Sequence, residues 1–392
     1  MELTKCKLGE LITQRREKND GSNLPICGVS KDGLIPPKQI DADTSIYNVF
    51  YRDDFIFNPA RMELNSIAIN DKYDRAICSS LYEVFFVNRT DLLLPHYLKL
   101  IVKQKWFTRY CEFLGQGSAR EYCRFNNISE IEIEFPSVEE QQRIVDYYSS
   151  IQKRIALKKQ INDNLAETIK AIFKSWFLDF NALDNAELVQ SQYGLIPKGW
   201  HYESLGNLCE CVTKGTTPTT LGKDFTKTGI NFIKGESIND DHSFNKSLFA
   251  HIDDETDELL KRSRICENDI VFTIAGTLGK FALVDSSVVP ANTNQAVAII
   301  RTSKISPEML YSYFVGGWQV EFYKRNTQQA VQANLSLGTI KDLPILLPDD
   351  NGQIRYMGLI KPIITEIKTN FAEIERLYDL QNQILTRLSS RR

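Results

Sequence analysis

The sequence has no long apolar run. None of its segments approaches eighteen consecutive apolar residues, which is close to the length that a membrane-spanning helix requires. The opening residues 1–7 (MELTKCK) also lack the apolar core of a secretory signal peptide. We therefore expect neither a membrane span nor secretion.

Cysteine and histidine are too scattered to predict a metal site. The eight cysteines include one close pair, Cys209 and Cys211, and the four histidines show no spacing typical of a metal or catalytic centre. A structural zinc site needs about four nitrogen or sulfur ligands at fixed spacing. Free thiols in a reducing cytoplasm are the simpler interpretation.

Positive charge is not in excess. The chain holds 47 Lys and Arg residues against 50 Asp and Glu residues, so its formal net charge is −3. This balance does not indicate a surface that attracts nucleic acid as a whole. Any contact with DNA must rely on local basic patches.

Motifs of catalysis are missing as well. Segment 276–280 (GTLGK) is too short for a phosphate-binding loop. Segment 58–61 (NPAR) approaches the Asn/Asp-Pro-Pro-aromatic motif of an adenine methyltransferase, but lacks the second proline and the aromatic residue. Segment 366–368 (EIK) has nuclease-like spacing but falls within a predicted helix. We predict no catalytic residue, no metal and no cofactor.

What the chain does contain is one pattern written twice. Segment 128–136 (ISEIEIEFP) aligns with 340–348 (IKDLPILLP) at an offset of 212 residues, and Trp106 matches Trp318 at the same offset. Upstream, 54–57 (DFIF) matches 269–272 (DIVF) at an offset of 215. A repeat of this length predicts two related domains.

Each half consists of short predicted strands followed by helices. Runs of Val, Ile and Phe between turn residues predict strands at 83–87, 270–274, 281–284 and 296–300. Ser306 before Pro307 predicts a helix over 306–324, because serine caps helices and proline suits the first helical position. A long helix then follows in each half.

Both long helices carry a row of residues at alternating steps of four and three. The rows comprise Ile144, Tyr148, Ile151, Ile155, Lys158, Asn162, Leu165, Ile169, Ile172 and Trp176, and Tyr356, Ile360, Ile363, Ile367, Asn370, Ile374, Leu377, Gln381, Ile384 and Leu388. Such alternation over about four heptads predicts a coiled coil, in which the polar members set the register. The alternative is that each helix packs only on its own domain.

Two like domains on a helical rod would act as a spacing device. A helix over 144–176 spans roughly 50 Å at 1.5 Å per residue. Packed against its counterpart, it would hold two copies of one kind of binding surface a set distance apart.

Four segments resemble the specificity subunits of type I restriction–modification systems. They are the start of the first long helix at 135–145 (FPSVEEQQRIV), its end at 171–180 (AIFKSWFLDF), the domain start at 195–205 (LIPKGWHYESL) and the strand and turn at 269–280 (DIVFTIAGTLGK). The first domain departs from this pattern, because it begins near Leu8 without the Pro-x-Gly-Trp sequence that precedes the second. With the duplication, the resemblance extends over essentially the whole chain.

The resemblance implies an α+β protein with two repeated mixed α/β target-recognition domains, joined by two long antiparallel coiled-coil helices. It places recognition domains at 1–136 and 196–348, spacer helices at 137–180 and 349–392, and a linker at 181–195. Each domain would read one half of a bipartite site in double-stranded DNA. Two methyltransferase subunits would dock on the chain, and nuclease–translocase subunits would join them.

Basic clusters indicate where the first domain could meet DNA. Duplex recognition needs cations for phosphates and forked or amide donors for base edges. Segment 99–125 carries six positive and two negative residues, and segment 5–18 carries five positive and two negative residues. Ordinary solvated charge is the alternative for each residue. The candidates of this half are Arg15, Arg16, Lys18, Arg61, Lys105 and Arg120.

The second domain is less basic and richer in amides. Segment 326–334 (NTQQAVQAN) holds five amide side chains, which could bond adenine edges or simply decorate a loop. By position in the repeat, 329–332 aligns with 117–120. The candidates of this half are Lys214, Thr216, Lys280, Gln329, Gln332 and Asn334.

Trp176, Phe177 and Phe180 gather aromatic surface at the end of the first long helix. The resemblance suggests that they dock a methyltransferase subunit, and the alternative is that they close the helix against a domain of the chain itself. Two other functions stay open. One is a DNA methyltransferase or nuclease with diverged motifs, and the other is an adaptor whose twin domains grip proteins.

Overall fold

The computed structural model describes residues 3–37, 39–40, 43–115, 122–183, 186–320 and 334–389. The chain forms two compact units: unit 1 comprises Met1–Ala156 and Glu375–Arg392, and unit 2 comprises Leu157–Ile374. Helices α4 (Val138–Phe173) and α10 (Asp350–Ser389) each contribute a portion to both units. Each unit therefore combines one globular domain with part of both long helices, a division that the sequence boundaries did not anticipate.

The described part of unit 1 is built on two four-stranded sheets. One is antiparallel, in the order β2 (Ile12–Arg15), β9 (Glu83–Val87), β6 (Phe55–Phe57) and β7 (Ile67–Ile69). The other, in which β3 and β8 are parallel, has the order β4 (Gly33–Ile35), β3 (Ile26–Ser30), β8 (Arg75–Cys78) and β5 (Asn48–Tyr51). A separate pair joins β1 (Thr4–Lys7) to β10 (Glu132–Phe135).

Helices cover the antiparallel sheet of unit 1. They are α1 (Pro95–Val102), α2 (Lys105–Gly115) and α3 (Phe125–Ser129), with 3-10 helices η1 (Leu8–Glu10), η2 (Thr44–Ile46) and η3 (Pro59–Leu64) in the connections. Phe55, Phe57 and Phe85 of the sheet share a buried cluster with Leu98 of α1 and Phe107 of α2. This cluster is the core on which the strand ends of unit 1 are positioned.

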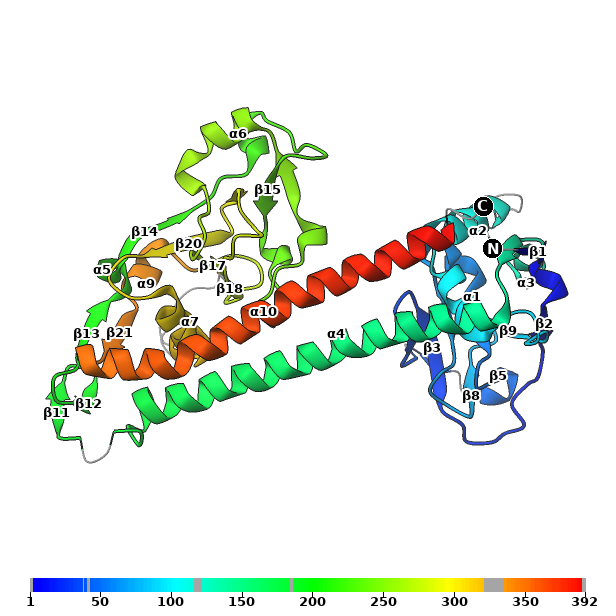
Figure 1. The fold of residues 1–392 in the computed structure, drawn as a ribbon, viewed down its shortest axis with the longest axis horizontal. Helices are drawn as coiled ribbons and strands as arrows, with labels where there is room; N and C mark the ends of the chain where they lie inside the picture. Colours follow the sequence, from blue (N-terminus) through cyan, green and yellow to red (C-terminus); the bar gives the residue numbers. More distant parts are fainter. Residues whose placement is uncertain are drawn as a thin grey trace. The chain divides into compact units, whose positions relative to one another are not determined.

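The described part of unit 2 repeats this plan. Its antiparallel four-stranded sheet has the order β14 (Cys209–Lys214), β20 (Val297–Thr302), β17 (Ile270–Thr273) and β18 (Phe281–Leu283), as Figure 1 shows. A three-stranded sheet has the order β16 (Ala250–Ile252), β15 (Ile230–Ile233) and β19 (Ala291–Thr293), with β15 and β19 parallel. The pair β13 (His201–Ser204) and β21 (Pro344–Leu347) matches β1 and β10.

The predicted strands are confirmed in both units, since β9, β17, β18 and β20 lie within one or two residues of their expected ends. In the part of unit 2 that the structure describes, the shorter helices are α5 (Leu205–Leu208), α6 (Asp254–Leu259), α7 (Pro307–Val315) and α9 (Leu337–Lys341). Its 3-10 helices are η5 (Pro218–Leu221), η6 (Gly235–Ser237), η7 (Lys246–Leu248) and η8 (Lys261–Ser263).

The predicted rows are sheltered from solvent in both long helices. Every position of both rows is described, and each is buried or half-buried. Within unit 2, Asn370 Nδ2 donates to Asn162 Oδ1 over 2.8 Å, and Lys158 Nζ lies 3.0 Å from a carboxylate oxygen of Glu373. Higher numbers on α4 thus meet lower numbers on α10, so the two helices run antiparallel there (Figure 1).

Three expected boundaries differ in the structure. The linker expected at 181–195 includes β11 (Leu188–Ser191), which pairs with β12 (Gly194–Pro197) in a hairpin, and Gly194 has the positive φ of a tight turn. The helix expected over 306–324 ends as α7 at Val315, where Gly316 and Gly317 follow. The first long α-helix ends at Phe173 rather than at 180, and a π-helical turn, η4 (Lys174–Leu178), follows it.

All eight cysteines lie in the described residues, and each is a free thiol. Among the described helices, none combines the length and the apolar character needed to span a lipid bilayer.

Candidate nucleic-acid interface

The candidates of unit 2 collect at one end of its four-stranded sheet. Lys214 ends β14 and pairs with Ala298 of β20, which pairs with Phe272 of β17, which pairs with Phe281 of β18. Since neighbouring strands are antiparallel, the ends of β14 and β17 meet the starts of β20 and β18. Lys280 directly precedes β18, so it lies at the same sheet end as Lys214.

The loop that follows Lys214 is pressed against the segment that enters β20. A Cβ at Gly215 would lie 1.7 Å from the carbonyl oxygen of Thr293, so only glycine fits there. The Gly215 N–H donates to the carbonyl of Asn294 over 3.1 Å. This close approach fixes the path of Thr216, which is half-buried, while the Lys214 side chain is exposed and bonds no described residue.

The turn before Lys280 is organised by a buried threonine. The Lys280 N–H donates to Thr273 Oγ1 over 2.9 Å, and that hydroxyl donates to the carbonyl of Thr277 over 2.6 Å. The Lys280 ammonium lies 2.9 Å from a carboxylate oxygen of Asp240. Sequence reasoning missed Asp240, because its contact joins residues forty positions apart.

Asn334 also lies near this sheet end. The N–H of its neighbour Leu335 donates to the carbonyl of Ile274, one residue beyond β17, over 2.9 Å. Asn334 itself is exposed. Gln329 and Gln332 lie outside the described residues, but the chain that follows them returns to the sheet end that carries Lys214 and Lys280.

Unit 1 uses the same backbone hydrogen bond at the matching positions. The N–H of Cys123 donates to the carbonyl of Pro59 over 3.0 Å, and these residues precede Leu335 and Ile274 by the repeat offsets of 212 and 215. Arg120 lies outside the described residues, just before this anchored return. Both amide- and arginine-bearing segments therefore lead back to the same strand end in their own units.

Arg15, a sequence candidate for DNA contact, is held by an ion pair within unit 1. Its Nε and Nη2 donate to the two carboxylate oxygens of Asp54 over 2.6 and 3.1 Å, and its guanidinium lies over the rings of Tyr51 and Phe86. Asp54 is 2% exposed. Burial raises the pKa of Asp54, while the hydrogen bonds from Arg15 and from the Tyr51 N–H oppose that rise.

Unit 2 neutralises the matching aspartate from a different strand. Asp269 precedes β17 as Asp54 precedes β6, and it accepts two hydrogen bonds of 2.8 Å from Arg301 of β20. The strand register places Arg301 where unit 1 has Phe86, while the arginine of unit 1 comes from β2. Asp269 is 1% exposed, so Arg301 neutralises a buried carboxylate as Arg15 does in unit 1, and the hydrogen bonds to Asp269 raise the pKa of Arg301.

The other candidates of unit 1 keep exposed cationic groups. Among the described residues, Arg16 makes no ion pair, and the side chains of Arg61 on η3 and Lys105 at the start of α2 make no polar contact. Lys18 is also exposed, but its ammonium is bonded to oxygens of the segment 46–48. Arg16 follows the end of β2, and Arg61 follows the end of β6, at the sheet end that matches the one in unit 2.

Sequence reasoning missed Glu83 and Arg124 at this end of unit 1. Glu83 begins β9 and accepts hydrogen bonds from the Arg124 side chain over 3.3 Å and from the Phe125 N–H over 2.7 Å. Arg124 was counted within a basic segment, but its position beside the sheet depends on the fold. Glu83 therefore fixes the return of the segment that carries Arg120.

Comparison with known proteins identifies the family to which these repeated domains belong. The family model for the type I restriction modification DNA specificity domain matches residues 9–167 and 197–377. The chain belongs to this specificity-domain family. The resemblance seen in four sequence segments is thereby confirmed, and the two matches correspond to the two halves of the repeat.

Named relatives cover most of the chain. The specificity subunit of the type I restriction enzyme MjaIX from Methanocaldococcus jannaschii is 24% identical over 304 residues, which are 76% of this chain and 69% of that subunit. The HindI specificity subunit from Haemophilus influenzae is 23% identical over 82% of each chain. The crystal structure of the S subunit of a type I restriction–modification system from M. genitalium has a TM-score of 0.56 at 14% identity, covering 99% of this chain and 96% of that one, so it shares the fold.

The aromatic residues at the end of α4 form part of a core in the second specificity domain. Trp176 and Phe177 are 3% and 2% exposed, and both contact the rings of Trp200 and Tyr356. Their burial contradicts the expectation that these two rings dock a partner, and supports the alternative that they close the helix against the domain. Phe180, which is half-buried beside Trp200, stays a candidate for docking.

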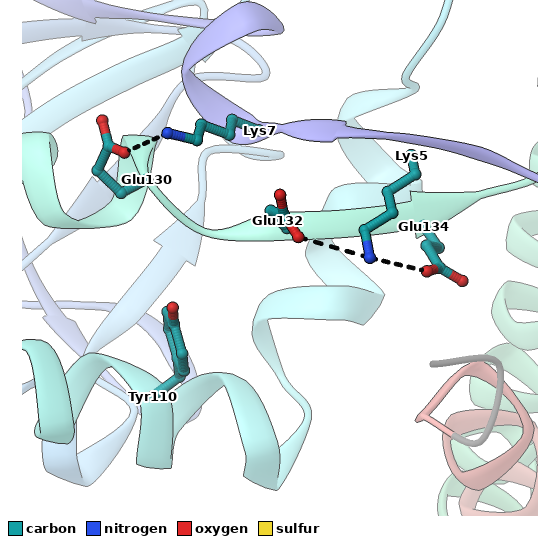
Figure 2. A pocket seen from close by; sticks show the side chains of 6 residues that line it. All are labelled: Lys5, Lys7, Tyr110, Glu130, Glu132 and Glu134. Atoms are coloured by element: carbon teal, nitrogen blue, oxygen red, sulfur yellow. Dashed lines mark hydrogen bonds and ion pairs between the residues drawn. The ribbon is translucent and has the colours of Figure 1, made fainter.

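A pocket on the first specificity domain contains none of the predicted residues. Figure 2 shows its lining, which consists of Lys5, Lys7, Tyr110, Glu130, Glu132 and Glu134. Lys5 lies 3.5 and 3.4 Å from two of the glutamates, and Lys7 lies 2.7 Å from the third. The ammonium groups are thus already paired with carboxylates, and exposed pairs of this kind contribute little to stability. The pocket offers no set of free cations for phosphate.

Proposed function

We propose that the chain is the DNA-reading subunit of a type I restriction–modification complex, in which each specificity domain recognises one half of a bipartite sequence. The observation that carries this proposal is the repeated sheet end. In both units, exposed basic or amide side chains gather where the same backbone hydrogen bond returns a loop to the central strand. A reader of duplex DNA needs such a combination of phosphate and base donors on one surface.

The proposal divides the candidates by their chemistry. The ammonium groups (Lys18, Lys105, Lys214 and Lys280) suit phosphates, and the guanidiniums (Arg16, Arg61 and Arg120) suit phosphates or guanine edges. Thr216 and the amides Gln329, Gln332 and Asn334 suit base edges, with adenine favoured by the amides. The first domain would thus rely on arginine and the second on amides, which fits two different half-sites.

Helices α4 and α10 are proposed to set the gap between the half-sites as an antiparallel coiled coil. They comprise 36 and 40 residues, which correspond to about 54 and 60 Å at 1.5 Å per residue. The buried contact between Asn162 and Asn370 supports a fixed register, because a polar pair in an apolar seam disfavours other alignments.

Catalysis is proposed to come from partners. Two methyltransferase subunits would dock on the chain and supply the methyl-transfer chemistry, and nuclease–translocase subunits would join for cleavage. The chain itself would bind no cofactor and would act on cellular DNA in the cytoplasm. Phe180 remains a candidate contact for the methyltransferase.

The deciding experiment is a map of genomic methylation in cells with this gene present and with it deleted. We expect a methylated motif that depends on the gene and consists of two short defined halves around an unspecified gap of one length. A contiguous motif, or a gap of any length, would contradict the model of two readers on one spacer.

Two further measurements separate the alternative functions. The purified chain alone, incubated with S-adenosylmethionine and DNA, should show no turnover, whereas a diverged methyltransferase would methylate. With methyltransferase subunits present, the chain should bind the mapped sequence in a salt-sensitive manner, whereas an adaptor for proteins would not.

A further inference from the structure

An acidic side chain stands among the proposed DNA contacts of unit 2. The carboxylate of Asp240 lies 2.9 Å from the Lys280 ammonium, and the two side chains are 90% and 23% exposed. An ion pair as exposed as this adds little to the stability of the fold. Its position is unusual for a DNA-binding surface, since a carboxylate beside the proposed phosphate contact opposes the approach of DNA.

The carboxylate is held there by a built turn. The Asn239 N–H donates to the carbonyl of Ser243 over 3.0 Å, and the His242 N–H donates to the carbonyl of Asn239 over 3.2 Å. His242 has a φ of 66°, which places it in the left-handed region that side chains seldom adopt. Asp240 therefore belongs to a defined turn rather than to a freely moving segment.

An aromatic stack fixes this turn to the strand that carries the lysine. The His242 ring stacks on Phe281 with 4.0 Å between ring centroids and meets the edge of Tyr311 at 6.1 Å. Burial lowers the pKa of His242 to about 4, so the ring is neutral at neutral pH. Phe281 directly follows Lys280, so the stack fixes the turn that carries Asp240 beside the lysine.

The pairing affects specific and non-specific DNA differently. Non-specific binding draws essentially all of its free energy from phosphate contacts and released counterions. To bind a phosphate, Lys280 must break its ion pair with Asp240, and the unpaired carboxylate then lies close to the phosphate. The lysine therefore contributes less to non-specific binding. Specific binding adds contacts with base edges, and their free energy can offset the cost of moving Lys280 from Asp240 to a phosphate.

We propose that Asp240 is a specificity-determining residue that restrains Lys280 from phosphates until the second domain meets its correct half-site. This inference rests on the proposed DNA-reading function and extends it, since it assigns discrimination to a residue that need not touch a base. In the free chain Lys280 is paired with Asp240, and on the correct sequence it binds phosphate.

The test compares Asp240→Asn, Lys280→Ala and the double variant in the full chain with its methyltransferase subunits. Affinity is measured over a salt series for a duplex with the mapped motif and for an unrelated duplex. Asp240→Asn should bind the unrelated duplex several-fold more tightly, with a salt slope steeper by about one, and the ratio between the two duplexes should fall. In the Lys280→Ala background, Asp240→Asn should give no such gain.

The control is Asp241→Asn, which removes the neighbouring charge while keeping an acceptor for the Ser243 N–H. A gain equal to that of Asp240→Asn, or the same gain without Lys280, would show plain charge removal and overturn the proposal. No change from Asp240→Asn would also overturn it, even if Lys280→Ala weakens binding. Failure of this proposal can be distinguished from failure of the proposed function by the wild-type complex. The proposed function fails if the wild-type complex does not prefer the mapped duplex.

Discussion

Adjacent arginines at the end of β2 have opposite environments. Arg15 is 24% exposed in its side chain and donates from Nε and Nη2 to Asp54, whereas Arg16 is exposed and makes no ion pair among the described residues. Removing one member of a buried ion pair leaves an uncompensated charge, which is more costly than the pair is beneficial. Arg15 is therefore assigned a structural role, and the adjacent Arg16 keeps its proposed role in binding.

This contrast predicts different outcomes for Arg15→Ala and Arg16→Ala. We expect Arg15→Ala to lower the free energy of unfolding by about 3 kcal/mol, the lower end of the range for breaking a buried pair. Arg16→Ala should leave the unfolding curve unchanged and weaken DNA binding, with a salt slope lower by about one. Urea unfolding and DNA titrations check both. Equal stability of the two variants would contradict the structural role of Arg15.

At the scale of elements, the packed rows of α4 and α10 contain a buried pair of amides. Asn370 Nδ2 donates to Asn162 Oδ1 over 2.8 Å, and Lys158 Nζ donates to Asn370 Oδ1 over 2.7 Å. Both asparagines are buried, and the Asn162 Oδ1 and the Asn370 Nδ2 are bonded to each other. A buried amide left without a partner costs about 1–3 kcal/mol, whereas replacing both by apolar residues is close to neutral.

We therefore predict that Asn370→Leu destabilises the chain by about 1–3 kcal/mol and that Asn162→Leu added to it restores most of the loss. Asn164→Leu, on the exposed face of the same helix, is the matched control and should change stability little. Urea unfolding of the full chain measures all three. A double variant less stable than Asn370→Leu would show that the amides do more than satisfy each other.

Elements were predictable from the sequence where a period carries the information. The four-three alternation predicted most of the buried positions of the long helices, but not Gln141, Phe173, Gly352 or Ile364. Runs such as 83–87 predicted strands, and both patterns depend on neighbours in sequence. The burial of Trp176 and Phe177 was not predictable, since its cause is Trp200 and Tyr356, which are distant in sequence. For the same reason the ion pair between Arg15 and Asp54 was not predictable, although the basic segment that contains Arg15 was identified.

At the scale of the whole molecule, the duplication was readable but the surfaces of the two domains were only partly so. The repeat predicted both domains, whereas the common strand end at which the candidates gather is visible only in the fold. The repeat did not predict the roles of Asp240 and Glu83. These acidic residues form ion pairs with Lys280 and Arg124, which are distant in sequence and lie close only in the fold. A count of charges along the chain identifies basic segments, but it does not show which carboxylates form ion pairs with their cations.

The proposed spacer predicts a defined response to insertion. One heptad inserted in α4 and one in α10, each close to the Lys158–Glu373 contact, keeps the seam in register and lengthens each helix by about 10.5 Å. At 3.4 Å per base pair, this adds roughly three base pairs to the gap. Methylation will weaken, since half-sites on one face of DNA recur at about 10–10.5 base pairs.

Methylation mapping checks this prediction, and the sites that remain methylated should keep both original half-sites and show a changed gap. Four-residue insertions at the same two places are the control, because they rotate the seam out of register and should lower stability without a new defined gap. Full activity with the original gap in the heptad variant would mean that the helices do not set the spacing.

The different origins of Arg15 and Arg301 restrict how such genes can recombine. Consider a first domain that receives strand β2 by recombination from a domain built like the second one. It would keep Asp54 but would have no arginine to pair with it. The resulting buried charge costs about 3–5 kcal/mol. The reciprocal hybrid would direct two guanidiniums at one carboxylate. Crossovers at Pro136 and Pro348 keep each aspartate in the same domain as its own arginine. Recombination should therefore exchange whole recognition domains, with their half-site preferences, and rarely parts of a domain.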